Sequence, residues 1–91
     1  ISAFPEQLYL KAYPNPFQDR LEVEFVLMES STIDITLVDA SGRSVLTISE
    51  DQFFGAGYHQ LNASTAELSS GIYLLRFRIA GNLNEIKLIK P

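Results

Sequence analysis

The sequence of 91 residues contains no cysteine and no tryptophan, and its only methionine is Met28. The absence of cysteine excludes a disulfide scaffold, thiolate chemistry and thiolate metal sites, although it does not fix the compartment. No apolar run approaches the roughly 18 residues that a membrane-spanning helix needs, so we expect no transmembrane segment. Because the chain begins at Ile1, we expect it to be a piece of a longer precursor.

Basic residues are scarce and unevenly placed. Seven Lys and Arg stand against eleven Asp and Glu, which gives a formal net charge of −4. Residues 71–91 nevertheless carry Arg76, Arg78, Lys87 and Lys90 against Glu85 alone. Four cations in one segment are too few for general binding to phosphates, so we expect no nucleic-acid partner.

The length bounds the kind of function. A chain of 91 residues forms one small domain that folds without disulfides. It has no room for both a core and an enclosed substrate cavity of ordinary size. We therefore expect no enzyme, no catalytic residue and no cofactor.

Alternation of apolar and polar residues, the pattern of half-buried strands, is clearest in residues 20–27 and recurs in residues 32–38. Residues 28–31 fit a short connection, which predicts a hairpin between the two strands. The side chains expected to point inward are Leu21, Val23, Phe25, Leu27, Ile33, Ile35 and Leu37.

Turn residues divide the middle of the chain. Asp39-Ala40-Ser41-Gly42 has a side-chain acceptor and a glycine where a turn needs them, so the chain reverses into a strand at residues 43–48. Residues 52–57 predict a loop or bulge leading into a strand at 58–61. Residues 63–68 fit a single helical turn, and no long helix is expected.

The strongest strand pattern follows Gly71, in residues 72–79, and we expect this strand to sit centrally. Residues 80–82 turn the chain into a closing strand at 84–90. At the other end, residues 8–12 predict a first strand and residues 1–7 a linker remnant, so that the domain spans 8–91. The inward side chains of the two C-terminal strands are Tyr73, Leu75, Phe77, Ile79, Ile86 and Leu88.

Seven short strands at intervals of about 8 to 12 residues indicate an all-β fold, an antiparallel immunoglobulin-like β-sandwich. The Cys and Trp markers of true immunoglobulin domains are missing, so only the architecture is predicted. A partly open barrel is the alternative.

Few residues point to chemistry. His59 is the only histidine, and a zinc site needs three or four ligands, so it is interpreted as a side chain on a strand and no metal site is expected. Glu22 and Glu24 fit a solvated strand face better than a pair of glycosidase carboxylates. Asp39 fits a turn better than a calcium loop.

An aromatic platform for a sugar or a partner is a further interpretation. It would use exposed rings, although the aromatic content is ordinary for a sandwich core. The candidates are Tyr9, Tyr13, Phe53, Phe54 and Tyr58.

The segment Tyr13-Pro14-Asn15-Pro16-Phe17 is stiff, because each proline removes an amide donor and keeps the preceding residue extended. It is either a rigid corner between strands or a preorganised surface that a partner recognises. The residues alone favour neither interpretation.

Four motifs in order carry a resemblance to a known family. They are Tyr13–Phe17, Val38-Asp39-Ala40-Ser41-Gly42-Arg43-Ser44-Val45, Leu68-Ser69-Ser70-Gly71-Ile72-Tyr73-Leu74-Leu75, and Lys87-Leu88-Ile89-Lys90. Together they resemble the C-terminal sorting domain of the type IX secretion system, of the type A class, over residues 8–90. Gly55–His59 fits the family's fifth strand only loosely. Pro91 follows the expected closing lysine, and we expect native residues to follow it if the sequence is cut there.

The resemblance implies an immunoglobulin-like domain that acts as a secretion signal. It implies export of an N-terminally attached cargo through the periplasm to the surface or medium of a Gram-negative bacterium. The implied partners are the outer-membrane translocon, the shuttle proteins of the type IX system and a sortase-like surface peptidase that removes the domain. Residues 1–7 would lie near the cleavage site.

The resemblance also implies which residues form the signal. Pro14, Asn15 and Pro16, followed by Phe17, match the opening motif. Gly42 matches a turn, and Gly71 and Tyr73 match the penultimate strand. Lys87, Leu88, Ile89 and Lys90 match the closing strand.

We expect recognition at the closing strand, through its unpaired edge and the lysine heads at its rim. Deletion of residues 87–90 is then expected to abolish export. The edge also suits a weak homodimer. The alternative functions are a carbohydrate-binding or adhesion β-sandwich, with the aromatics around residues 53–58 as its site, and an inert domain that stabilises an attached enzyme.

Overall fold

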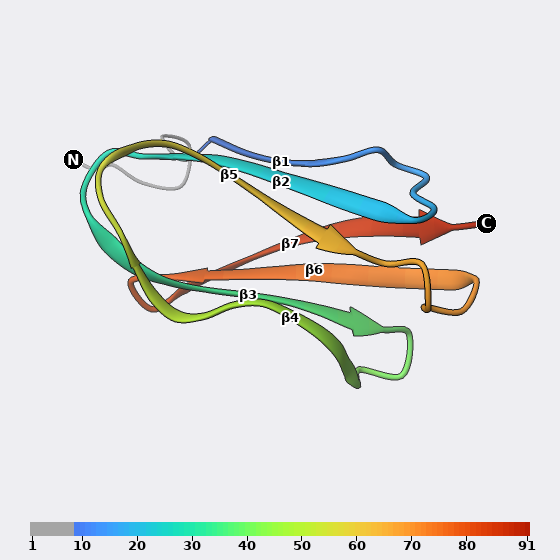
Figure 1. Cartoon of the computed structure of the whole chain (residues 1–91). Coiled ribbons are helices and arrows are strands. Elements are labelled where there is room, and N and C mark those ends of the chain that lie inside the picture. Colours follow the sequence, from blue (N-terminus) through green and yellow to red (C-terminus); the bar gives the residue numbers. More distant parts are fainter. Residues whose placement is uncertain (1–8) are drawn as a thin grey trace.

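A computed structural model describes residues 9–91, which form seven strands in two antiparallel sheets packed face to face (Figure 1). The strands are β1 (Tyr9–Tyr13), β2 (Arg20–Leu27), β3 (Ser31–Asp39), β4 (Ser44–Phe54), β5 (Gly57–Ser64), β6 (Gly71–Ile79) and β7 (Asn82–Lys90). One sheet has the order β1-β2-β5 and the other β4-β3-β6-β7. This confirms the predicted all-β immunoglobulin-like sandwich over the alternative barrel.

The fourth strand sets the arrangement apart from a constant-type immunoglobulin domain, where it joins the sheet of the first two strands. Here β4 pairs with β3 instead. The central place expected for the strand after Gly71 is confirmed, because β6 lies between β3 and β7. The expected linker at 1–7 and Leu8 of the expected first strand lie outside the described residues.

Alternating side chains fill the space between the sheets as predicted. Phe25 lies at the centre, with edge-to-face contacts to Phe54 at 5.2 Å and Phe77 at 5.1 Å between ring centroids. Ile79 and Ile86 are only partly buried against this core. The buried apolar cluster consists of Phe17, Leu21, Val23, Phe25, Leu27, Ile33, Ile35, Leu37, Phe54, Tyr73, Leu75, Phe77 and Leu88.

The predicted hairpin between residues 20–27 and 32–38 is wrong. β2 and β3 belong to different sheets, and the connection between them crosses from one layer to the other. Two successive strands with the same alternation can lie side by side in one sheet, or they can lie in two sheets whose apolar faces pack against each other. β2 and β3 take the second arrangement, and Leu27 of β2 and Ile33 of β3 both belong to the shared core.

The loop predicted at 52–57 is largely strand. β4 continues through Phe54, and a bulge places Glu50 and Asp51 opposite the single residue Asp34 of β3. The backbone amide of Asp51 donates a hydrogen bond to the Asp34 carboxylate. At this register shift the Asp34 carboxylate takes the place of a backbone carbonyl as the acceptor for the Asp51 amide.

The helical turn predicted at 63–68 is also wrong. β5 extends to Ser64, and a tight turn follows, closed by a hydrogen bond of 3.1 Å from the Leu68 amide to the Thr65 carbonyl. Residues 9–91 contain no helix, and therefore none that could cross a membrane.

Candidate functional site

The opening motif and the closing strand, which lie more than 70 residues apart in the sequence, meet at one edge of the sandwich. The link between β1 and β2 runs along the outer edge of β7, next to the C-terminal end of the chain (Figure 1). The Asn15 amide nitrogen donates to the Lys87 carbonyl at 3.2 Å, and the Ile89 amide donates to the Asn15 side-chain oxygen at 3.1 Å. We call these two bonds the Asn15 clamp.

The Phe17 amide extends the clamp by donating to the Ile89 carbonyl at 2.9 Å. Prolines suit the positions around Asn15, because Pro14 and Pro16 bring no amide that would need a partner. Both X-Pro peptide bonds are cis. The expectation of an unpaired edge on the closing strand is therefore wrong at Lys87–Ile89. The outward backbone groups of β7 are hydrogen-bonded to the opening motif there.

Phe17 anchors the link in the core. Its side chain is fully buried and meets the Tyr73 ring edge to face, with centroids 5.7 Å apart. The Tyr73 hydroxyl donates to the Ser69 carbonyl four residues upstream, which is the geometry of a tyrosine corner in an immunoglobulin-like sandwich. The opening motif and the penultimate-strand motif are thus packed against each other.

Lys90 does not lie at the rim of the fold as expected. Only 8% of the residue is exposed, and its ammonium donates to the carbonyls of Thr65 at 2.7 Å, Ala66 at 3.2 Å and Leu68 at 2.7 Å. These three acceptors satisfy all three donors of a lysine head. The reason for the difference is the turn after β5, whose carbonyls converge on the end of β7. We call this arrangement the Lys90 lock.

Thr65 was not predicted as a site residue, yet it joins the lock to the opening link. The residue is 1% exposed, its hydroxyl donates to the Gln18 carbonyl at 2.8 Å, and its amide donates to the Asp19 carbonyl at 2.9 Å. Its own carbonyl accepts from Lys90. No local pattern marks such a residue, because its partners come from both ends of the chain.

The other residues of the closing strand point to opposite sides. Leu88 is fully buried in the core, whereas Ile89 is exposed and Lys87 projects from the outer face of the sheet. Gly71 pairs with Lys90 and adopts φ 154°, a conformation that side chains disfavour. The structure therefore brings the opening motif, the penultimate-strand motif and the closing strand together. Gly42 also lies near them, because it lines one groove with Tyr73 and Lys87.

Gly42 lies in the turn between β3 and β4, at φ 88°. The turn is organised by Asp39, which accepts hydrogen bonds from the Ser41 amide at 2.9 Å, the Ser41 hydroxyl at 2.7 Å and the Arg43 amide at 3.0 Å. Bonds from Ser41 and from Arg43 lower the pKa of the Asp39 carboxyl to about 2. Asp39 is thus a turn residue with its oxygens engaged.

The candidate aromatic platform is split by the fold. Phe54 belongs to the core, and Phe53 is exposed at the end of β4. The three tyrosines gather on the outer face of the β1-β2-β5 sheet, where Tyr9 and Tyr13 donate to the Glu24 carboxylate. The hydrogen bond between Tyr13 and Glu24 raises the pKa of the Tyr13 phenol to about 12 and lowers the pKa of the Glu24 carboxyl.

His59 packs on this side of the core. Its ring stacks on Phe25 with centroids 5.4 Å apart, and its Nε2 lies 2.7 Å from the Gly55 carbonyl. Among residues 9–91 no group of three His, Cys, Asp or Glu side chains could hold a metal ion.

Comparison with known proteins places the chain in a family. No curated protein matches its sequence. The sequence profile described as the secretion system C-terminal sorting domain matches residues 11–90, from β1 to the last residue of β7. The match includes all the residues of the Asn15 clamp and the Lys90 lock. The chain therefore belongs to this family and is a type IX secretion C-terminal sorting signal.

Proposed function

We propose that residues 8–91 carry an N-terminally attached cargo across the outer membrane through the type IX translocon, and that its shuttle proteins recognise the folded domain rather than a linear tail. Family membership implies export to the cell surface or extracellular space of bacteria. Domains of this family are not normally catalytic. The cargo, not the domain, then supplies the activity.

The observation that carries the proposal is the way in which the closing strand is held. The Asn15 clamp covers the edge of β7 at Lys87–Ile89, and the Lys90 lock closes its end. The closing strand would have to break these contacts before a partner could bind it as an extended peptide. The signal is therefore complete only when the opening motif and the closing strand have met in the folded domain.

Removal of the domain at the cell surface is the second part of the proposal. We propose residues 1–7 as the linker in which a sortase-like peptidase cuts, which frees the cargo from a folded domain. Residues 1–7 precede the part of the chain that matches the family, residues 11–90, so a cut there would leave the sorting domain whole. In a strain lacking the peptidase, exported cargo would keep the mass of the domain.

An export assay tests the proposal. Residues 1–91 are fused behind a periplasm-targeted fluorescent protein, and fluorescence at the surface and in the medium is compared with that of a translocon-deficient strain. Export that depends on the translocon supports the signal. A stable fusion that remains in the periplasm of both strains would refute it.

Deletion of residues 87–90 abolishes export under this proposal, but it also removes Leu88 from the core and Lys90 from its lock. Asn15→Ala is the sharper variant, because it opens the clamp and leaves the core residues in place. We expect its export to fall in proportion to the loss of folded domain.

Glycan binding is the second candidate function, favoured by the three tyrosines on one outer face. Flat aromatic faces beside carboxylate and amide groups are suited to sugar rings. Tyr9 and Tyr58 remain 46% and 58% exposed. Binding of the domain to a glycan array, lost in Tyr58→Ala, would support this function independently of export.

A further inference from the structure

The outer face of the four-stranded sheet departs from the polar pattern of a solvated antiparallel sheet. Ile72 and Ile89, which pair across β6 and β7, are 48% and 42% exposed. Leu74 adjoins them on the same face of β6. Val38 pairs with Leu74 from β3 and is buried, although it lies outside the core cluster. An apolar strip therefore crosses three strands on the side away from the core.

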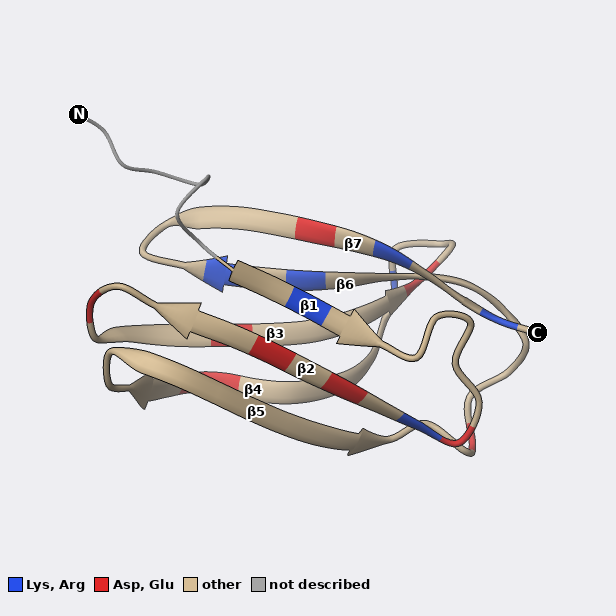
Figure 2. Ribbon diagram, turned by 90° about the horizontal axis from the view of Figure 1, so that it is seen from above, with Lys and Arg blue, Asp and Glu red and all other residues tan. Residues whose placement is uncertain are grey.

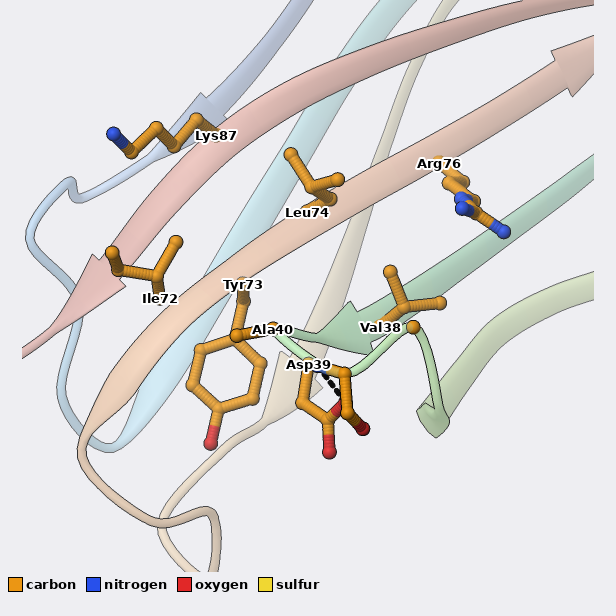
Figure 3. Close-up of a pocket in the computed structure, with 10 residues that line it drawn as sticks. Val38, Asp39, Ala40, Ile72, Tyr73, Leu74, Arg76 and Lys87 are labelled. Carbon is orange, nitrogen blue, oxygen red and sulfur yellow. Dashed lines mark hydrogen bonds between the residues drawn. The ribbon is translucent and has the colours of Figure 1, made fainter.

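An open groove of about 440 Å³ follows this strip (Figure 3). Val38 and Leu74 line it from the sheet, and the 39–42 turn forms part of its wall. Figure 3 shows Lys87 and Arg76 on either side of Leu74. The groove thus has an apolar floor with Lys87 and Arg76 at its border, and Lys87 is the one lysine of the closing strand that is exposed. Asp39 also lines the groove, but its carboxylate is engaged by Ser41 and Arg43.

Within residues 9–91, two cations of this face have no ionic partner. Arg76 is paired with Glu85 at 2.9 Å, but Lys87 and Arg78 make no ion pair with any other residue in 9–91. Asp34, which lies opposite Arg78, accepts the Asp51 amide instead. Figure 2 shows the basic residues along β6, whereas β2 in the other sheet carries acidic ones.

We propose that this face docks a segment of an outer-membrane protein of the export machinery, in which apolar side chains are flanked by carboxylates. The proposal rests on the export function above and names the surface that is read. Apolar side chains fill the groove, and the carboxylates pair with Lys87 and Arg78. Contiguous exposed apolar surface with a charged rim is the usual mark of such a contact.

Charge distinguishes this occupant from the others. A second copy docked through the same face would bring Lys87 and Arg78 against the same two cations, which opposes a symmetric dimer. Recognition of anionic lipid commonly uses clusters of about four to eight basic residues. On this face only two cations lack an ion pair within residues 9–91: Lys87 lines the groove, and Arg78 lies farther along β6.

The test is the export assay with a matched pair of double variants. Lys87→Glu with Ile72→Asp reverses a charge and polarises the strip through two exposed side chains. Lys11→Glu with Met28→Asp makes the same chemical changes on β1 and in the β2–β3 connection, away from the face. Melting by circular dichroism establishes that both are folded.

We expect export of the first double variant to fall by about tenfold or more, which corresponds to about 1.4 kcal/mol of docking free energy, and export of the control to stay near wild type. Failure of the wild-type fusion to be exported refutes the proposed function itself. Normal export of the folded first variant refutes the docking surface alone.

Two further results would also overturn the proposed occupant. One is a wild-type dimer in sedimentation that Lys87→Glu dissociates, because the occupant would then be a second copy. The other is wild-type binding to phosphatidylglycerol vesicles that Lys87→Glu abolishes, which would assign a lipid.

Discussion

The Asn15 clamp makes a prediction that separates its two hydrogen bonds. Asn15→Ala removes both the donor to the Lys87 carbonyl and the acceptor for the Ile89 amide. A typical hydrogen bond contributes about 0.5 to 1.5 kcal/mol. Because Asn15 is exposed, water replaces part of what is lost, and we expect a loss of about 1 to 2 kcal/mol of unfolding free energy. For a domain of this size each kcal/mol lowers the Tm by about 4 to 8 °C.

Asn15→Asp keeps the acceptor but replaces the donor with an oxygen that faces the Lys87 carbonyl. At neutral pH the carboxylate and the carbonyl repel each other, so this variant is expected to be less stable than Asn15→Ala. Their repulsion raises the pKa of the new carboxyl in the folded state above its ordinary value of about 3.9. Below the ordinary pKa of about 3.9 the carboxyl is protonated and can donate to the Lys87 carbonyl. The Asn15→Asp variant therefore recovers stability at low pH and loses it as the pH rises through the folded-state pKa.

Urea unfolding followed by far-ultraviolet circular dichroism measures both effects, since the chain has no tryptophan. Asn82→Ala and Asn82→Asp are the controls, because Asn82 lies exposed at the start of the same strand, β7, and its side chain makes no hydrogen bond to any other residue in 9–91. Equal unfolding free energies for wild type and Asn15→Ala would refute the clamp. An Asn15→Asp deficit that does not change between pH 3 and pH 7 would refute the assignment of the donor.

Three other perturbations test the remaining contacts. Lys90→Met removes the charged donor of three carbonyls and should cost about 2 to 4 kcal/mol in urea unfolding, whereas Lys87→Met should stay within about 0.5 kcal/mol of wild type. Asp39→Asn should lower the Tm at pH 7. Because the pKa of Asp39 is lowered to about 2, that difference should disappear as the pH falls from about 4 through 2, and a constant difference would contradict it. In a titration of tyrosine absorbance, one phenol should ionise only near pH 12, and Tyr13→Phe should remove that step.

The strands and their inner faces could be predicted because they depend on local alternation. Phe25, Leu37 and Leu75 lie inside for the reason the pattern indicates. Sheet membership could not be predicted, since alternation gives the face of a strand but not its neighbour. The same limit hid the meeting of Asn15 with Lys87, because nothing in either segment refers to the other.

Lys90 is a different case, because the sequence pattern does predict the face of the strand on which it lies. It continues the period that places Ile86 and Leu88 inward, so alternation alone assigns it to the inner face. The charge of the side chain favoured the rim instead. A buried lysine head needs three acceptors, and those come from a turn after β5 whose carbonyls no residue pattern reveals.

The two cationic residues of the closing motif therefore have separate tasks. Lys90 faces inward and ties the strand to the β5–β6 turn, while Lys87 faces outward over the groove. The alternation of the strand enforces this division, since residues three apart point to opposite faces. Substitutions at Lys90 should then change export and stability together, whereas those at Lys87 should change export alone. If Lys87→Glu lowers export and no change in folding conditions restores it, recognition lies on the outer face of the sheet. The Lys90 lock then holds β7 in the position that exposes Lys87 to the partner.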